Sequence, residues 1–225
     1  MSAYEKSYTD EEFEKELNAP GRKFGLDHYN IIINAKNMRK GYHIDDTGKK
    51  KVLFILMKNV INEKLQDMAT TSFKDLAKKK NYNRGLASGK PEGSKTVRHT
   101  KDGQSMSINS STSNIAGYYD RPNRQHKSSF ATNVACRKTA FTKNNIELWE
   151  NALPFIQKCS EMYERKGGHY YKEQKEELDK IKKDMRIPNT VFTTVTVNYN
   201  WRTACHKDTG DYSKGLGNLA VTGRD

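Results

Sequence analysis

The chain has 225 residues, of which 34% are hydrophobic and 10% aromatic, enough for one large or two small domains with a buried core. Its 40 lysines and arginines exceed its 27 acidic residues, and the formal charge of +13 is typical either of a protein with a polyanionic partner such as nucleic acid or of an ordinary basic surface. No stretch has the length and apolarity of a membrane span and the N-terminus lacks a signal-peptide centre, so we expect a soluble protein of the nucleus or cytoplasm.

The three cysteines are Cys136, Cys159 and Cys205. None of them has the close CxxC spacing that zinc sites and redox pairs require. We therefore expect reduced thiols.

The first part of the chain carries few structural signals. Residues 1–50 mix charge runs with glycine and proline, and the apolar run Tyr29–Ile33 is a candidate strand. Lys51–Met57 predicts a short buried strand. Asn62 offers an N-cap for a helix to about Lys80, with apolar positions at helical spacing at Leu65, Met68, Phe73 and Leu76.

The segment from Asn81 to about Ser113 is rich in Gly, Ser, Asn and Lys and shows neither helical nor strand periodicity. It predicts one or more long loops. Loops of this length in a compact domain are usually functional or disordered.

Two helices are expected next. In residues 146–167 a stripe at helical spacing predicts a core-facing helix, with Pro154 producing a kink or a break. The stripe consists of Ile146, Trp149, Leu153, Ile156, Cys159 and Tyr163. A charged, solvated helix is predicted from about Tyr170 to Met185, closed by Pro188.

Residues 190–201, TVFTTVTVNYNW, are dense in β-branched and aromatic types and alternate with a period of two. This is the clearest strand signal in the chain.

An HxD pair, His206 and Asp208, follows that strand. Alternate residues of an extended segment project to the same face, so the imidazole and the carboxylate can share one ion. Two histidines and one carboxylate on one side of Fe(II) leave room for a keto acid and O2, and an HxD at a strand end is the expected start of such a site. Taken alone, the pair is more often an exposed histidine beside a solvated aspartate than a metal site.

Several further sequence blocks along the chain bear on the interpretation of the HxD pair. They are NYNRGLASG (81–89), GYYDRPNRQHKSSFATNVACRKT (117–139), the helix with LWENALPFIQKC and the segment 191–221 that ends in KGLGNLAV. In order and spacing these blocks resemble the TET/J-binding-protein family of nucleic-acid dioxygenases. The resemblance covers about residues 50–225, so we expect an N-terminal extension over 1–50 and a dioxygenase domain over 51–225.

The resemblance implies an α+β fold with a double-stranded β-helix (jelly-roll) core, an N-terminal strand and packing helices. His206 and Asp208 are then the first two ligands of Fe(II), and 2-oxoglutarate is the co-substrate, with ascorbate as the alternative in one branch of the family. The implied reaction hydroxylates the 5-methyl group of 5-methylcytosine or thymine in DNA. That methyl group lies inside a duplex, so the pyrimidine must be flipped out or single-stranded.

Five further positions follow from the resemblance. Asp211 stands three places after the second iron ligand and can face the pyrimidine edge, or it is a turn former in DTGD. Arg137 and Asn198 occupy positions that hold 2-oxoglutarate or the DNA backbone, although Arg137 can equally pair with an acidic neighbour. Arg84 and Arg121 are candidates for phosphate contacts, or for solvated basic loops.

The sequence also departs from the family pattern. The family continues with more strands, a distal histidine ligand and a basic residue for the far carboxylate of 2-oxoglutarate, whereas no histidine follows His206 here. His169 precedes a helical stretch and is a poor substitute. We therefore expect an incomplete barrel that lacks its C-terminal part. The alternatives are a non-catalytic basic nucleic-acid-binding module, or a split product with open sheet edges.

Overall fold

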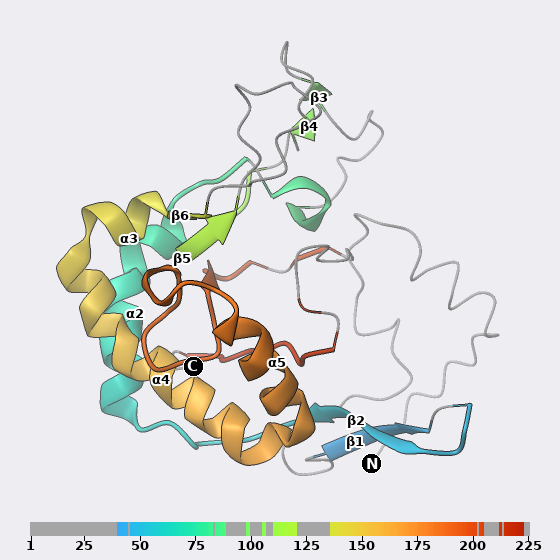
Figure 1. Cartoon of the computed structure of the whole chain (residues 1–225). Coiled ribbons are helices and arrows are strands. Elements are labelled where there is room, and N and C mark those ends of the chain that lie inside the picture. The colour runs from blue at the N-terminus through green and yellow to red at the C-terminus, as the bar shows by residue number, and fades with distance from the viewer. Residues whose placement is uncertain are drawn as a thin grey trace, which may run out of the picture. The chain divides into compact units, whose positions relative to one another are not determined.

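The computed structural model describes residues 40–44, 46–82, 84–88, 98–99, 105–106, 110–120, 136–201, 203–204, 212 and 214–222 (Figure 1). The candidate strand Tyr29–Ile33 lies outside these residues. The chain divides into two units. The hairpin unit comprises Met1–Val60, Tyr82–Ser111 and Arg202–Lys207, and the sheet unit comprises Ile61–Asn81, Thr112–Trp201 and Asp208–Asp225.

The hairpin unit is built on an antiparallel ribbon of β1 (Lys40–Ile44) and β2 (Lys50–Ile55), with a register shift between Gly41 and Tyr42. The strand predicted over 51–57 is therefore confirmed as β2. Its predicted burial is wrong, because the Leu53 side chain is 63% exposed.

The segment predicted as long loops holds only short elements in its described part. They are the 3-10 turn η2 (Gly85–Ser88) and the paired strands β3 (Arg98–His99) and β4 (Ser105–Met106). Of the twelve described residues between 82 and 111, eight lie in these short elements, so the loop prediction holds there only in part.

The sheet unit begins with α2 (Glu63–Lys78). The Asn62 side chain accepts a hydrogen bond from the Leu65 N–H at 2.9 Å, which confirms the predicted N-cap. The buried face of the helix consists of Ala69, Ser72, Phe73 and Ala77.

A three-stranded antiparallel sheet has the order β6-β5-β7, with β5 (Ser113–Asp120) in the centre. Its neighbours are β6 (Cys136–Lys138) and β7 (Thr194–Asn198), and β7 confirms the predicted strand over a shorter span. β5 was not predicted. The described residues thus form a mixed α+β fold with small antiparallel sheets, and the jelly-roll topology stays an expectation.

Three helices follow β6 in the chain. They are α3 (Ala140–Asn144), α4 (Ile146–Gly167) and α5 (His169–Asp179). α4 runs through Pro154 without a break, so the alternative of a break there is wrong. Ile146 is 60% exposed and does not belong to the predicted core stripe, whereas Trp149 is buried as expected.

The second predicted helix is shorter than expected. α5 ends at Asp179, and a separate 3-10 turn, η3 (Lys183–Met185), follows. The Arg186 guanidinium donates to the backbone carbonyls of Asp179 and Ile181 and pairs with the Asp179 carboxylate. These bonds satisfy carbonyl groups that a longer helix would use, so the chain can leave the helix here.

The core of the sheet unit lies where α2 and α4 pack together and contact the sheet (Figure 1). Phe73 of α2 and Phe141 of α3 have ring centroids 5.7 Å apart. The buried cluster consists of Ala69, Phe73, Ala116, Tyr118, Phe141, Trp149, Ala152, Phe155, Ile156 and Ile187.

In the described part of the chain neither Cys136 nor Cys159 forms a disulfide, which agrees with the predicted reduced thiols, and Cys205 lies outside the described residues. Burial raises the pKa of the Cys159 thiol to about 11, which keeps it protonated at neutral pH. Among the described helices none is both long and apolar enough to span a membrane.

Gly117 is the position where the central strand meets both neighbouring strands and α3. Its N–H donates to the Thr142 hydroxyl at 2.8 Å and its carbonyl accepts from the Thr139 N–H at 2.9 Å. Its φ is +100°, and a Cβ atom would lie 2.5 Å from the Thr193 carbonyl oxygen. Only glycine fits this backbone and this contact.

We predict that Gly117→Ala destabilises the protein by more than the roughly 1–3 kcal/mol of a strained backbone, because the contact with Thr193 must also open. The melting temperature should fall by about 2–4 °C per kcal/mol. Gly48 has φ +76° but open space around it, so Gly48→Ala measures the cost of backbone strain without a steric collision. Gly217 also faces open space, and Gly217→Ala should leave the melting temperature unchanged. Equal melting temperatures for Gly117→Ala and Gly217→Ala would contradict this account.

Candidate active site

The predicted iron ligands His206 and Asp208 lie outside the described residues, as do Asp211 and Arg121. His206, Asp208 and Asp211 lie in one segment, residues 205–211, which is flanked on both sides by described residues. The contacts of these flanks therefore define how the chain enters and leaves the motif.

The upstream flank is held within the hairpin unit. The Ala204 N–H donates to the Ala87 carbonyl at 2.9 Å, and both side chains are buried, with 2% and 5% exposure. The structure thus joins the residue two places before His206 to the NYNRGLASG block, which lies more than a hundred residues earlier in the chain.

Arg84 belongs to the same turn, because its carbonyl accepts from the Ala87 N–H at 3.1 Å. Its side chain is half-buried, and its Nε atom is enclosed without a hydrogen-bond partner in the described part of the chain. If Arg84 contacts a phosphate, the contact is therefore made by its terminal guanidinium nitrogens.

The downstream flank is held within the sheet unit. The Leu216 N–H donates to the Tyr163 hydroxyl at 3.0 Å, and that hydroxyl donates to Gln174 Oε1 at 3.2 Å. Tyr212 accepts from the Gly215 N–H at 3.0 Å, which forms a turn directly after the motif. A tyrosine of α4 and a glutamine of α5 therefore fix the chain as it leaves residues 205–211.

Tyr163 is buried, and this burial raises the pKa of its phenol. Its ring meets Tyr171 edge-on at 5.5 Å and stacks with Phe192 at 6.5 Å. Tyr163 was predicted only as part of an apolar stripe, and its positioning role was missed. The available signal was its hydroxyl group, because a tyrosine in a core usually has a hydrogen-bond partner.

The two predicted cofactor-binding residues lie at opposite ends of the sheet. Arg137 pairs with Tyr119 near the end of β5, whereas Asn198 pairs with Ser113 at its beginning. Six residues of strand separate the two places, roughly 20 Å. Both side chains are exposed, and the sheet does not present them as one pair. Asn198 stands at the end of β7 from which the chain continues to His206.

The donor types of the HxD motif fit Fe(II), since an imidazole and a carboxylate are two of the three ligands of a non-haem iron site. Within the described residues, no group of three or more His, Cys, Asp and Glu side chains lies close enough to hold a metal ion. His169 begins α5, where its ring lies 3.9 Å from the Tyr170 ring. The HxD motif therefore remains the metal-site candidate.

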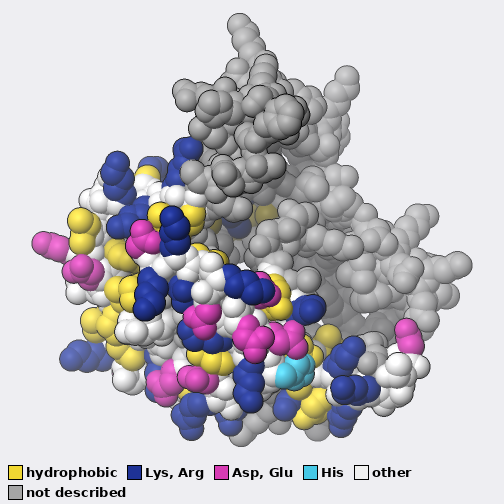
Figure 2. All heavy atoms as spheres, in the orientation of Figure 1, with side chains coloured by type: hydrophobic (Ala, Val, Ile, Leu, Met, Phe, Trp, Pro, Cys, Tyr) yellow, Lys and Arg dark blue, Asp and Glu magenta, His cyan; other side chains and the backbone are white. Residues whose placement is uncertain are grey.

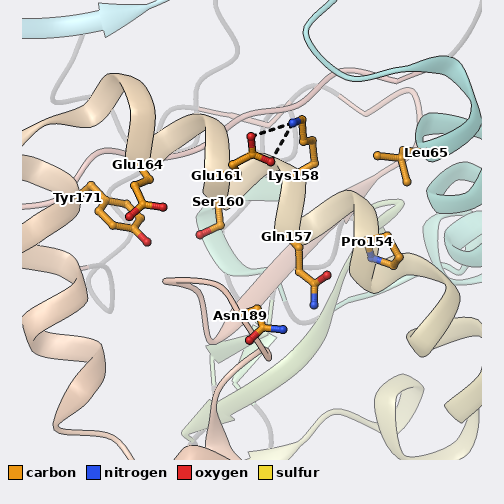
Figure 3. A pocket seen from close by; sticks show the side chains of 9 residues that line it. All are labelled: Leu65, Pro154, Gln157, Lys158, Ser160, Glu161, Glu164, Tyr171 and Asn189. Carbon is orange, nitrogen blue, oxygen red and sulfur yellow. Dashed lines mark hydrogen bonds and ion pairs between the residues drawn. The ribbon is translucent and has the colours of Figure 1, made fainter.

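A surface pocket of about 410 Å³ lies on the helical side of the sheet unit (Figure 3). It is lined by Leu65, Pro154, Gln157, Lys158, Ser160, Glu161, Glu164, Tyr171 and Asn189. The Lys158 ammonium donates to both Glu161 oxygens, at 2.9 and 2.8 Å, and these hydrogen bonds lower the pKa of Glu161. None of the predicted site residues lines this pocket, so we do not assign it to the reaction.

Positive charge alone does not locate an interface. Figure 2 shows Lys and Arg side chains spread over the visible face of the described residues, with Asp and Glu side chains among them. A nucleic-acid interface must therefore be argued from the contacts of individual side chains.

Comparison with known proteins shows which class of protein the chain belongs to. Residues 114–224 match the oxygenase domain of the 2OGFeDO superfamily, a match that includes the sheet, α4, α5 and the HxD motif. Through these residues the chain belongs to the TET/J-binding-protein family.

Curated relatives support this membership. The chain is 39% identical over 109 residues, 48% of its length, to thymine dioxygenase JBP1-A of Trypanosoma cruzi. It is 35% identical over 112 residues to thymine dioxygenase JBP1 of Trypanosoma brucei brucei, and 30% identical over 184 residues, 80% of its length, to the bifunctional helicase and thymine dioxygenase JBP2 of Trypanosoma cruzi. The matched regions cover only 12–14% of these relatives. No solved structure matches the chain.

We predict that Tyr163→Phe leaves the partly buried Leu216 N–H without its acceptor, which costs less than the roughly 1–3 kcal/mol of a fully buried donor. Hydrogen exchange, followed by mass spectrometry, should speed up in residues 212–217 while exchange in α2 stays unchanged. Tyr170→Phe, which removes the hydroxyl of a different tyrosine, on α5, serves as the control. Unchanged exchange at Leu216 would show that the Tyr163 hydroxyl does not hold this flank.

Proposed function

We propose that the protein is an Fe(II)- and 2-oxoglutarate-dependent dioxygenase that hydroxylates the 5-methyl group of a pyrimidine in DNA, with thymine as the first candidate and 5-methylcytosine as the second. The observation that carries the proposal is the HxD motif inside the region that matches the oxygenase family. Thymine is placed first because the relatives are named thymine dioxygenases.

In this proposal His206 and Asp208 bind the iron on a double-stranded β-helix core. Bound Fe(II), 2-oxoglutarate and O2 supply the oxidation of the methyl group, with decarboxylation of the keto acid. The contribution of the chain is to orient the two ligands. Two contacts support this role: Ala204 is hydrogen-bonded to Ala87 within the hairpin unit, and Leu216 is hydrogen-bonded to Tyr163 within the sheet unit.

The remaining site residues have separate proposed roles. Asp211 accepts a hydrogen bond from the pyrimidine edge. Asn198 holds 2-oxoglutarate or the DNA backbone beside the β7 exit, and Arg137 does so at the other end of the sheet. Arg84 and Arg121 contact phosphates, and the target base reaches the site flipped out of the duplex or in a single strand.

The proposed domain division is an extension over 1–50 and the dioxygenase domain over 51–225. The 184-residue match to the JBP2 relative supports a domain longer than the 114–224 core. Whether ascorbate replaces 2-oxoglutarate is tested by omitting each compound in turn from the oxidation assay.

We predict that the purified chain, given Fe(II), 2-oxoglutarate and a thymine-containing duplex, forms 5-hydroxymethyluracil, which nuclease digestion and mass spectrometry detect, provided that a group other than a downstream histidine completes the iron site, because no histidine follows His206. The product should vanish in His206→Ala and in Asp208→Ala, because each substitution removes one metal ligand. A parallel duplex with 5-methylcytosine decides between the two bases.

Anaerobic calorimetric titration with Fe(II) provides a readout that does not depend on turnover. Both ligand variants should bind the metal more weakly than the parent chain, whereas His169→Ala should bind it equally well. DNA binding without product or metal binding would instead favour a non-catalytic nucleic-acid-binding module.

A further inference from the structure

A lysine-rich helix end and an exposed aromatic ring meet at one edge of the sheet unit. Lys78, the last residue of α2, places its ammonium 5.0 Å from the centre of the Tyr199 ring. Lys79 and Lys80 follow it, and all three lysines are exposed. Tyr199 follows β7 directly and is 44% exposed. We call these four residues the Lys78–Tyr199 patch.

The end of α2 is held in place by two side-chain amides. Asn114 Nδ2, on β5, donates to the carbonyls of Leu76 at 2.8 Å and Lys79 at 2.7 Å. Asn81 Nδ2 donates back to the Ser113 carbonyl at 3.0 Å. Asn114 is only 8% exposed, so these are partly buried, well-supported bonds that tie the helix end to the start of the central strand.

The backbone of Tyr199 is tied to the same strand end. Its N–H donates to the Thr112 carbonyl at 3.0 Å, and its carbonyl accepts from the Thr112 hydroxyl at 2.6 Å. Both sides of the patch thus rest on the N-terminal end of β5. Because these bonds fix the backbone that carries the lysines and the tyrosine, less backbone freedom is lost on binding.

Helix stability explains only part of this arrangement. A lysine in the last turn stabilises the negative end of the helix dipole, which accounts for Lys78. It does not account for Lys79 and Lys80 beyond the helix, or for an exposed ring contributed by another element. Among the described residues none of the three lysines forms an ion pair with an acidic side chain.

We propose that the Lys78–Tyr199 patch binds the phosphodiester backbone of the DNA strand that carries the target pyrimidine. Three exposed ammonium groups without acidic partners in the described part of the chain complement a polyanion, and the ring holds one of them in place. This proposal rests on the proposed function for the identity of the partner.

The patch is also tied to the reaction through the chain. Tyr199 directly follows the strand that leads to the metal motif, and His206 stands seven positions after it, at most roughly 25 Å of extended chain. At 3.4 Å per nucleotide, the contacted phosphates then lie within about seven nucleotides of the target base.

The test measures DNA affinity by fluorescence anisotropy at several salt concentrations, with the full chain, no iron and a labelled thymine-containing duplex. The triple substitution Lys78→Gln, Lys79→Gln and Lys80→Gln should lower the slope of log affinity against log salt by about 2–3, since each phosphate contact contributes about 0.9. The corresponding triple Lys→Arg variant should keep the slope.

A matched control exists on the β1–β2 ribbon. Lys49, Lys50 and Lys51 are also consecutive and exposed, and Lys50 lies 4.1 Å from the ring of the exposed Tyr42. The triple Lys→Gln variant there should change the slope less than the variant at 78–80. Tyr199→Ala should weaken binding by about 2- to 5-fold through the loss of the support for Lys78, and circular dichroism confirms that each variant is folded.

The proposal is overturned if the 78–80 variant keeps the parent slope, or if the 49–51 variant lowers the slope equally, which would indicate a diffuse basic surface. His206→Ala separates this proposal from the enzymatic one, because it should abolish oxidation and leave the salt slope unchanged. Oxidation with an unaltered slope in the 78–80 variant would refute the patch alone, and an altered slope without oxidation in the parent chain would refute the enzyme alone.

Discussion

The sheet unit depends on the backbone of Gly117, where the central strand approaches the Thr193 carbonyl too closely for any side chain. The same residue exchanges hydrogen bonds with Thr139 and Thr142, so it sets the start of α3 as well as the approach to β7. α4 follows α3 almost immediately and builds the core. The arrangement of the sheet and of the helices that cover it thus follows from one close backbone contact.

The chemistry of the candidate site depends on a segment whose two ends are fixed by different means. Upstream, a backbone hydrogen bond joins Ala204 to Ala87 between two buried alanines. Downstream, the hydroxyl of a buried tyrosine, Tyr163, accepts the N–H of Leu216. Neither anchor is a ligand in the proposal. In the proposal each anchor acts only by fixing the backbone of its own unit next to the motif, and a metal site needs such support because two donors must be presented at one ion.

The proposed substrate contact and the proposed metal site lie on the same length of chain. β7 begins beside Gly117, ends at Asn198, and continues through Tyr199 toward His206. Asn114, on the neighbouring strand β5, holds the end of α2 at the same edge of the sheet. An enzyme that oxidises one base must fix the strand that carries it, and this sheet edge offers positive charge at Tyr199, from which the chain continues to the proposed iron ligands.

Local patterns in the sequence predicted several features of this protein, namely the Asn62 cap and α2, the long α4, the alternating strand β7 and the HxD motif. Each of these features is recognisable from a short stretch of consecutive residues. Tertiary structure decided the rest. β5 escaped prediction because Ser113, Ala116 and Gly117 are small or polar and are buried without alternation. The contacts from Leu216 to Tyr163, Ala204 to Ala87 and Tyr199 to Lys78 join residues more than fifty positions apart. Such pairs leave no periodic trace in a single sequence, because they arise only when the packed elements bring distant segments together.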